Sequence, residues 1–172
     1  VKKMKFLLAK KEDLSCTMRI VADAQAYLAM QHIDQWQNGY PNEKVILNDI
    51  QNSESYVVES DELSIIATAM FSTRNEPTYT SIEGQWITKE NAPYGVIHRM
   101  AISENSRGTG IAKFIFNYCE QCLKQNAIKS MRIDTHEGNF GMQALLKKLD
   151  YVFCGVIYLE NTDKRLAYEK LI

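Results

Sequence analysis

The chain has 172 residues, and its 20 basic and 21 acidic side chains leave a formal net charge of −1. This length fits one domain with its own hydrophobic core, and a content of 45% hydrophobic and 24% charged residues argues against intrinsic disorder. The balanced charge argues against a dedicated nucleic-acid binder, and no apolar run reaches the roughly 18–20 residues that a membrane helix needs.

The cysteines and the N-terminal residues bear on the cellular compartment. The apolar stretch 6–9 is too short for the core of a signal peptide, so we expect a cytoplasmic protein with reduced thiols at Cys16, Cys119, Cys122 and Cys154. Cys119 and Cys122 form a C-x-x-C pattern inside a predicted helix, without a second pair of metal ligands. We therefore interpret them as buried or half-buried helix cysteines, with redox or metal chemistry as the alternative, and predict no metal site.

The first half of the chain mixes helical and strand patterns. Apolar residues at helical spacing predict helices, and β-branched runs predict strands. In chain order, the predicted elements are a strand at 5–9, helices at 14–30, 32–40 and 42–51, strands at 55–59 and 63–71, and a loop with some strand at 79–89.

The second half continues the alternation and holds the most informative loop. The predicted elements are a strand at 94–103, a loop at 104–110, a helix at 111–125, a strand at 129–135, a helix at 139–149, and strands at 152–159 and 165–171. About seven strands and four helices predict a mixed α/β fold. The chain has no repeat or Pro/Gly/Ser-rich linker, so we expect one domain over 1–172.

The loop between the strand at 94–103 and the next helix reads Ser106-Arg107-Gly108-Thr109-Gly110-Ile111-Ala112. The two glycines allow a tight turn and a close approach of the backbone to a ligand. The helix that follows directs free N–H groups and its positive dipole end into this turn, which favours phosphate, and Arg107 adds a cation. A glycine-rich turn without a function is the alternative interpretation.

Two common phosphate loops do not fit this segment. No G-x-x-x-x-G-K-[ST] spacing occurs, and a G-x-G-x-x-G loop fails because Lys113 stands at the place of the third glycine. The pattern that remains is R-x-x-G-x-A, formed by Arg107, Gly110 and Ala112.

This loop resembles the signature [QR]-x-x-G-x-[GA] of the GNAT superfamily of acetyl-CoA-dependent N-acetyltransferases. A second pattern of that family, N-x-x-A-x-x-L-Y-x-K-x-G-F, resembles residues 139–151, where Asn139, Leu145 and Lys148 match. The resemblance implies a central, mixed, mostly antiparallel sheet of about seven strands, flanked by about four helices. It also implies a pair of strands that splay apart to admit acetyl-CoA.

The resemblance also assigns cofactor contacts to this sequence. The backbone of Met100, Ala101 and Ile102 would pair with the pantetheine arm, and Asn139 would contact that arm near the thioester. The pyrophosphate would be held by the loop residues, which are Arg107, Gly108, Thr109, Gly110, Ile111 and Ala112.

Acetyl transfer to an amine requires a base, and three residues are candidates. His98 lies two residues before Met100, which predicts the same strand face, although it could be a hydrogen-bonded core histidine. His136 follows the strand at 129–135 and could instead cap the next helix. Glu83 lies in a loop and could instead be a solvated carboxylate.

The general acid is less clear, because Leu146 stands where many relatives have a tyrosine that protonates the thiolate. Tyr151 and Cys154 could replace it, although both also suit core packing. Trp36 and Tyr40 could form an aromatic wall for the acceptor or fill the core.

We therefore expect direct transfer of an acetyl group from acetyl-CoA to a small-molecule or peptide amine, without a metal, nucleic acid or membrane as partner. A homodimer is compatible with the resemblance. The alternatives are a non-catalytic acyl-CoA-binding or sensing module, which Leu146 favours, and another kind of nucleotide-binding domain.

Overall fold

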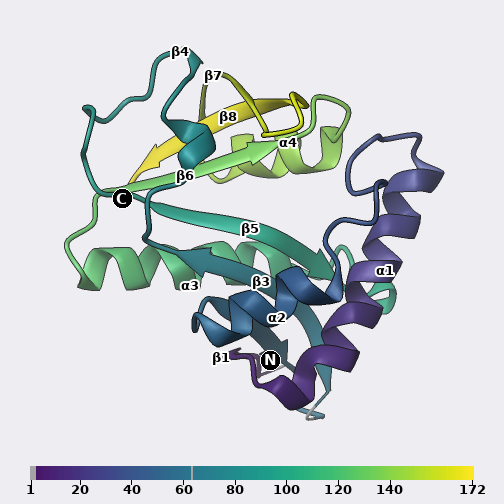
Figure 1. Ribbon diagram of the computed structural model, residues 1–172. Coiled ribbons are helices and arrows are strands. Elements are labelled where there is room, and N and C mark those ends of the chain that lie inside the picture. The colour runs from purple at the N-terminus through teal and green to yellow at the C-terminus, as the bar shows by residue number, and fades with distance from the viewer. Residues whose placement is uncertain (1–2, 63) are drawn as a thin grey trace. The chain divides into compact units, whose positions relative to one another are not determined.

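The computed structural model describes residues 3–62 and 64–172, and within them it contains four α-helices and eight strands (Figure 1). The helices are α1 (Leu14–Met30), α2 (Glu43–Gln51), α3 (Ile111–Gln125) and α4 (Phe140–Lys148). The strands are β1 (Lys5–Leu8), β2 (Ser55–Glu59), β3 (Ile65–Ser72), β4 (Glu83–Gly84), β5 (Gly95–Ile102), β6 (Ser130–Thr135), β7 (Val152–Tyr158) and β8 (Lys164–Leu171). The predicted first residue of the third strand, Leu63, lies outside the described residues.

Hydrogen-bonded strands follow the order β1-β2-β3-β5-β6-β8-β7-β4. The β5–β6 pair is parallel, whereas the β1–β2, β2–β3, β6–β8, β7–β8 and β4–β7 pairs are antiparallel. The prediction of a mixed, mostly antiparallel sheet is confirmed. The additional strand is β4, two residues in the segment expected to be a loop with some strand.

One predicted helix is wrong. Residues 32–40 form turns and bends, because the backbone has left-handed φ angles of 55° at His32, 63° at Trp36 and 70° at Gly39. A right-handed helix requires negative φ at every residue, so three left-handed residues within eight positions exclude it.

The chain forms two compact units. The first comprises Val1–Phe71 and Ile97–Tyr118, and the second comprises Ser72–Val96 and Cys119–Ile172, so β5 and α3 contribute to both. That the whole chain acts as one domain stays a prediction.

In the first unit, α1 and α2 pack on the side of β5 that carries Ala101. A core cluster joins Ile20 and Val21 of α1 to Ile46 of α2 and to Ala101, which is 3% exposed. The start of α2 is fixed by Asn42, whose Oδ1 accepts a hydrogen bond of 3.0 Å from the backbone N–H of Val45. The helix therefore begins where a polar cap precedes its apolar face.

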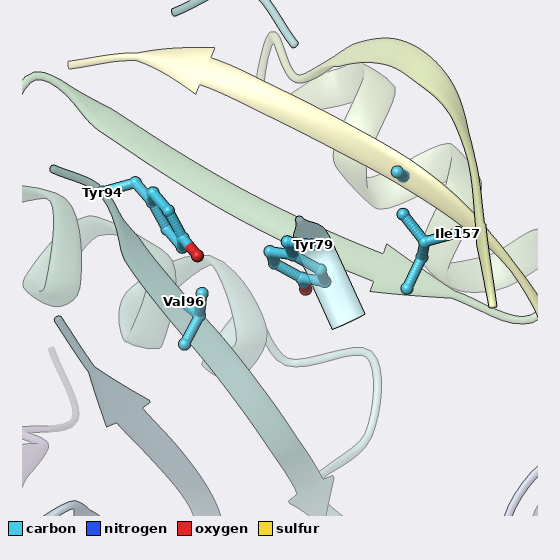
Figure 2. Close-up of a cluster of buried hydrophobic side chains, with 5 residues drawn as sticks. Tyr79, Tyr94, Val96 and Ile157 are labelled. Atoms are coloured by element: carbon cyan, nitrogen blue, oxygen red, sulfur yellow. The ribbon is translucent and has the colours of Figure 1, made fainter. Parts of the chain in front are cut away.

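In the second unit, an aromatic cluster packs against the strands (Figure 2). Tyr79 and Tyr94 lie with Val96, Ile157 and Ala167, and all five are buried. The Tyr79 hydroxyl donates a 2.6 Å hydrogen bond to Asp134 Oδ2. Burial, followed by the negative charge of Asp134, raises the pKa of Tyr79 well above its usual value.

A buried carboxylate ties the segment before β5 to the strands of the same unit. Glu169 of β8 accepts hydrogen bonds from Ser130 Oγ (2.6 Å), from the backbone N–H of Ile87 (2.5 Å) and from the Thr88 hydroxyl, and it pairs with Arg132 Nε at 3.3 Å. Burial alone would raise the pKa of Glu169, but these hydrogen bonds and the Arg132 charge outweigh it, so the pKa is lowered.

Candidate functional site

The loop at 103–110 is closed by its own hydrogen bonds. The Ser106 N–H donates to the Ser103 carbonyl at 2.9 Å, and the Thr109 hydroxyl donates to the Ser106 carbonyl at 2.6 Å. At its start, the Ser103 N–H donates to the Ile66 carbonyl of β3 at 2.9 Å. These hydrogen bonds give the loop a defined shape.

Gly108 and Gly110 give the loop its sharp turn before α3. Their φ angles are +74° and +86°, in the region that glycine adopts readily and other L-residues rarely do. An added Cβ at either position would meet no atom within 4 Å. The space above both glycines is therefore open, as the approach of a ligand to the backbone requires.

The first turn of α3 presents backbone donors to this loop. Its first hydrogen bond runs from the Phe114 N–H to the Gly110 carbonyl at 3.0 Å. The amides of Ile111, Ala112 and Lys113 come before that bond and, as at the start of any α-helix, have no partner within the helix. Such amides, together with the helix dipole, suit an anion.

Arg107 is held by α1 of the same unit. Its Nη2 donates to the backbone carbonyl of Asp23 at 3.1 Å, and its guanidinium carbon lies 4.4 Å from the centre of the Tyr27 ring. Arg107 is half-buried, and its guanidinium stacks on this ring. The cation predicted from the sequence is therefore fixed in place, by a helix about 80 residues earlier in the chain.

The strand before the loop contains an unusual residue, Arg99, with a φ of +51° inside β5. Its guanidinium makes a two-point ion pair with Asp49 of α2, from Nε to Oδ2 at 2.6 Å and from Nη2 to Oδ1 at 2.7 Å. Nη1 donates to the Tyr40 hydroxyl at 2.8 Å. Although burial opposes the charge, the bonds to Asp49 and Tyr40 outweigh it and raise the pKa of Arg99.

The residues on either side of Arg99 are half-buried. His98 and Met100 are both of intermediate exposure, as is Ile102, whereas Ala101 is buried against α1 and α2. The structure therefore places His98, the strand residues expected to contact pantetheine, and the loop at 107–112 in the same compact unit.

The other predicted site residues belong to the second unit. His136 Nδ1 accepts a hydrogen bond of 2.9 Å from the Gly138 N–H, so the neutral ring carries its proton on Nε2. Glu83 is exposed on β4 and accepts a hydrogen bond of 3.2 Å from the Tyr158 hydroxyl. Asn139 caps α4, where its Oδ1 accepts from the Met142 N–H at 3.1 Å.

Leu146 and the two residues considered as replacement acids, Tyr151 and Cys154, belong to the second unit. Leu146 is fully buried, and Tyr151 is buried with its hydroxyl donating to Glu120 Oε1 at 3.0 Å. Burial, followed by the Glu120 charge, raises the pKa of Tyr151. Burial also raises the pKa of the half-buried Cys154 thiol. A raised pKa makes each a weaker proton donor.

The two aromatic residues considered for the acceptor have different settings. Trp36 packs against the core cluster of the first unit, as the core-filling interpretation expects. Tyr40 is 41% exposed, and its hydroxyl is the acceptor for Arg99. Sequence reasoning overlooked Asp49, the ion-pair partner of Arg99. The available signal was a carboxylate three residues after Ile46, which puts both side chains on the same face of α2.

The C-x-x-C cysteines lie on α3, as predicted. Cys119 is buried and Cys122 is half-buried, and both are free thiols whose pKa is raised by burial. Across residues 3–62 and 64–172, the structure has no cluster of three or more potential metal ligands. No α-helix in that part of the chain is long and apolar enough to cross a membrane.

A family of enzymes fits this strand, loop and helix. The sequence model described as the acetyltransferase (GNAT) family matches residues 21–151. A GNAT-family acetyltransferase from Streptococcus agalactiae is 34% identical, with a TM-score of 0.86 over 98% of this chain and 95% of that one. The chain therefore belongs to the GNAT acetyltransferase family, whose members generally are acetyl-CoA-dependent N-acetyltransferases.

More distant structures share the fold. A GNAT-family acetyltransferase from Listeria monocytogenes is 16% identical with a TM-score of 0.77, and the match covers 100% of both chains. The PaiA N-acetyltransferase from Thermoplasma acidophilum, solved in complex with coenzyme A, is 15% identical with a TM-score of 0.69 over 99% of each chain. No curated protein sequence matches the chain.

Proposed function

We propose that this protein transfers an acetyl group from acetyl-CoA to a primary amine, directly and without an acetylated enzyme intermediate. One observation carries the proposal. In a GNAT family member, the loop after β5 has open, left-handed glycines at 108 and 110, followed by the free amides at the start of α3. No cysteine lies in this loop to serve as a nucleophile.

The residues of the first unit fit the acyl donor. The amides at 108–112 and the fixed Arg107 cation would hold the pyrophosphate, because both are donors suited to phosphate oxygens. The backbone of Met100, Ala101 and Ile102 would align the pantetheine arm. When bound, acetyl-CoA supplies the activated thioester.

The protein must remove a proton from the acceptor amine and stabilise a developing oxyanion. We propose His98 as the base, since imidazole takes up protons near neutral pH and this ring lies on the strand next to Met100. A backbone N–H of residues 100–102 would hold the oxyanion. His136 suits a donor role better than a base role, because its Nδ1 is already an acceptor. Glu83 remains a candidate for binding or deprotonating the amine.

The fully buried Leu146 favours one rival, a non-catalytic module that binds or senses acyl-CoA. With leucine at this position, the usual proton donor for the thiolate is missing. A thiol with a pKa of about 8.5 nevertheless departs reasonably well as a thiolate that solvent can protonate. We therefore expect a lower rate rather than no reaction.

Two measurements test the proposal. Isothermal titration with CoA, acetyl-CoA and ATP should show binding of both CoA species and no preference for ATP; a clear ATP preference would overturn it. Release of free thiol from acetyl-CoA is then followed across small amines, amino acid derivatives, aminoglycosides and peptides with free N-termini. Turnover with any of them supports the enzyme, whereas CoA binding with no turnover across the set supports the sensing module.

A further inference from the structure

The left-handed backbone at Arg99 is unusual for its place and its residue type. Strand residues have φ angles near −120°, and a non-glycine residue at +51° is uncommon even in loops. Such a residue rotates the peptide groups on both sides away from the regular ladder, as in a β-bulge. Met100, the next residue, opens the backbone segment proposed to align the pantetheine arm.

The Arg99 side chain explains how this conformation can persist. A strained backbone angle is kept when the surrounding structure determines it from several directions. Arg99 is held at three nitrogens, by two bonds to Asp49 and one to Tyr40. Asp49 is only 3% exposed and is part of α2, so the anchor belongs to a packed helix and not to a mobile loop.

The same face of α2 also contacts the strand through apolar packing. Ile46 lies one helical turn before Asp49 and packs in the cluster that contains Ala101. α2 therefore contacts β5 at two places, by an ion pair at Arg99 and by side-chain packing at Ala101. Met100 lies between these two residues.

Three of the five guanidinium N–H groups donate to Asp49 and Tyr40, so the side chain is committed to contacts within the unit. The backbone of Arg99, which continues into Met100, is the part of this residue that can affect the reaction. We propose that Arg99 is a positioning residue: its ion pair with Asp49, supported by Tyr40, fixes the left-handed turn in β5 that aligns residues 100–102 with the acyl donor. This inference rests on the proposed function.

Single and double variants separate positioning from folding. Asp49→Asn keeps the shape but removes the charge, and Arg99→Lys keeps the charge but loses the two-point geometry. The double variant Arg99→Gln with Asp49→Asn leaves no unpaired buried charge, so it should be more stable than Asp49→Asn alone. Glu59→Gln is the control, since it breaks a 3.8 Å ion pair with the exposed Lys5 between β1 and β2.

The measurements are the CoA dissociation constant, the KM for acetyl-CoA, kcat and thermal unfolding. We expect Asp49→Asn and Arg99→Lys to raise the CoA dissociation constant about tenfold, which corresponds to the loss of about one hydrogen bond between the arm and the strand backbone. The double variant should regain thermal stability without regaining affinity. Glu59→Gln should leave affinity and kcat unchanged.

Hydrogen–deuterium exchange over residues 97–103 distinguishes positioning from a merely structural role, because only positioning predicts a change in how CoA protects this segment. CoA should slow exchange of this segment in the parent and do so much less in the double variant. If the folded double variant binds CoA with the affinity of the parent and CoA slows its exchange as much as in the parent, the positioning role is wrong. If the parent itself fails to bind CoA, the proposed function fails instead, so the two failures are distinguishable.

Discussion

Replacing Gly108 by alanine separates the backbone conformation of the loop from its role in binding phosphate. Gly108 has a φ of +74°, and a Cβ there would meet no atom within 4 Å, so the cost to folding comes from the backbone alone. A left-handed L-residue costs about 1–2 kcal/mol. For a chain of this size, each kcal/mol lowers Tm by roughly 2–4 °C. The variant should therefore fold and should melt a few degrees earlier.

The effect on CoA binding should be larger than the effect on stability. The new methyl group would occupy the open space above the loop and keep a phosphate from the amides. Losing even one charge-assisted hydrogen bond costs about 1.5–3 kcal/mol, which corresponds to at least about a tenfold weaker affinity. Isothermal titration measures the dissociation constant for CoA, and differential scanning calorimetry measures Tm.

Gly39 provides a matched control. Its φ is +70°, an added Cβ there also meets nothing within 4 Å, and it lies outside the proposed phosphate loop. Gly39→Ala should lower Tm by a similar amount and leave CoA affinity at the parental value. The reasoning is refuted if Gly108→Ala binds CoA as tightly as the parent, or if both alanine variants weaken binding equally.

Three further predictions concern His98, Glu169 and the pair of buried tyrosines, Tyr79 and Tyr151. His98→Ala should lower the acetyl-transfer rate at neutral pH more than it lowers CoA affinity, and equal rates in variant and parent would remove His98 from the mechanism. Glu169→Gln should cost about 3–5 kcal/mol at neutral pH, because it leaves Arg132 buried without its counter-charge. The pKa of Glu169 is lowered in the folded state, so its contribution to the free energy of unfolding is present above about pH 4.3 and is lost as the pH falls through the lower folded value. The free energies of unfolding of parent and variant, measured in urea, should therefore converge in acid. The pKa values of Tyr79 and Tyr151 are raised, so their contribution to stability is present below about pH 10 and lost above it. Absorbance at 295 nm should show these two phenols ionising only as the protein unfolds, and their titration with the exposed tyrosines would contradict this.

The elements that sequence reasoning located best are those with strong local signals. The bounds of α1 and α3 agree with the predicted ranges 14–30 and 111–125. In α3 the glycine at 110 marks where the helix can begin, and apolar residues at helical spacing define the rest. The segment at 32–40 gave a wrong prediction because its left-handed angles at His32 and Trp36 occur in residues that carry no glycine-like signal.

The candidate bases show why a motif does not assign a role. His136 follows a predicted strand and His98 lies within one, and neither pattern distinguishes a hydrogen-bond donor from an acceptor. The hydrogen bond from the Gly138 N–H to Nδ1 determines that a neutral His136 ring carries its proton on Nε2. That bond depends on the turn that follows β6. A tautomer is therefore a property of the folded turn, which residue type and spacing do not encode.

The proposed acyl-donor site combines two kinds of information. The loop at 106–112 is contiguous, so glycines and the start of a helix make its backbone shape readable from a few residues. The groups that hold the two arginine side chains are distant in the sequence. Arg107 donates to the backbone carbonyl of Asp23, 84 residues away, and Arg99 pairs with the carboxylate of Asp49, 50 residues away. No sequence pattern at Arg99 indicates a left-handed backbone, so this feature could only be found in the structure. The proposed phosphate site is thus predictable from local sequence, whereas the proposed alignment of the thioester depends on an ion pair that forms only when α2 packs on β5.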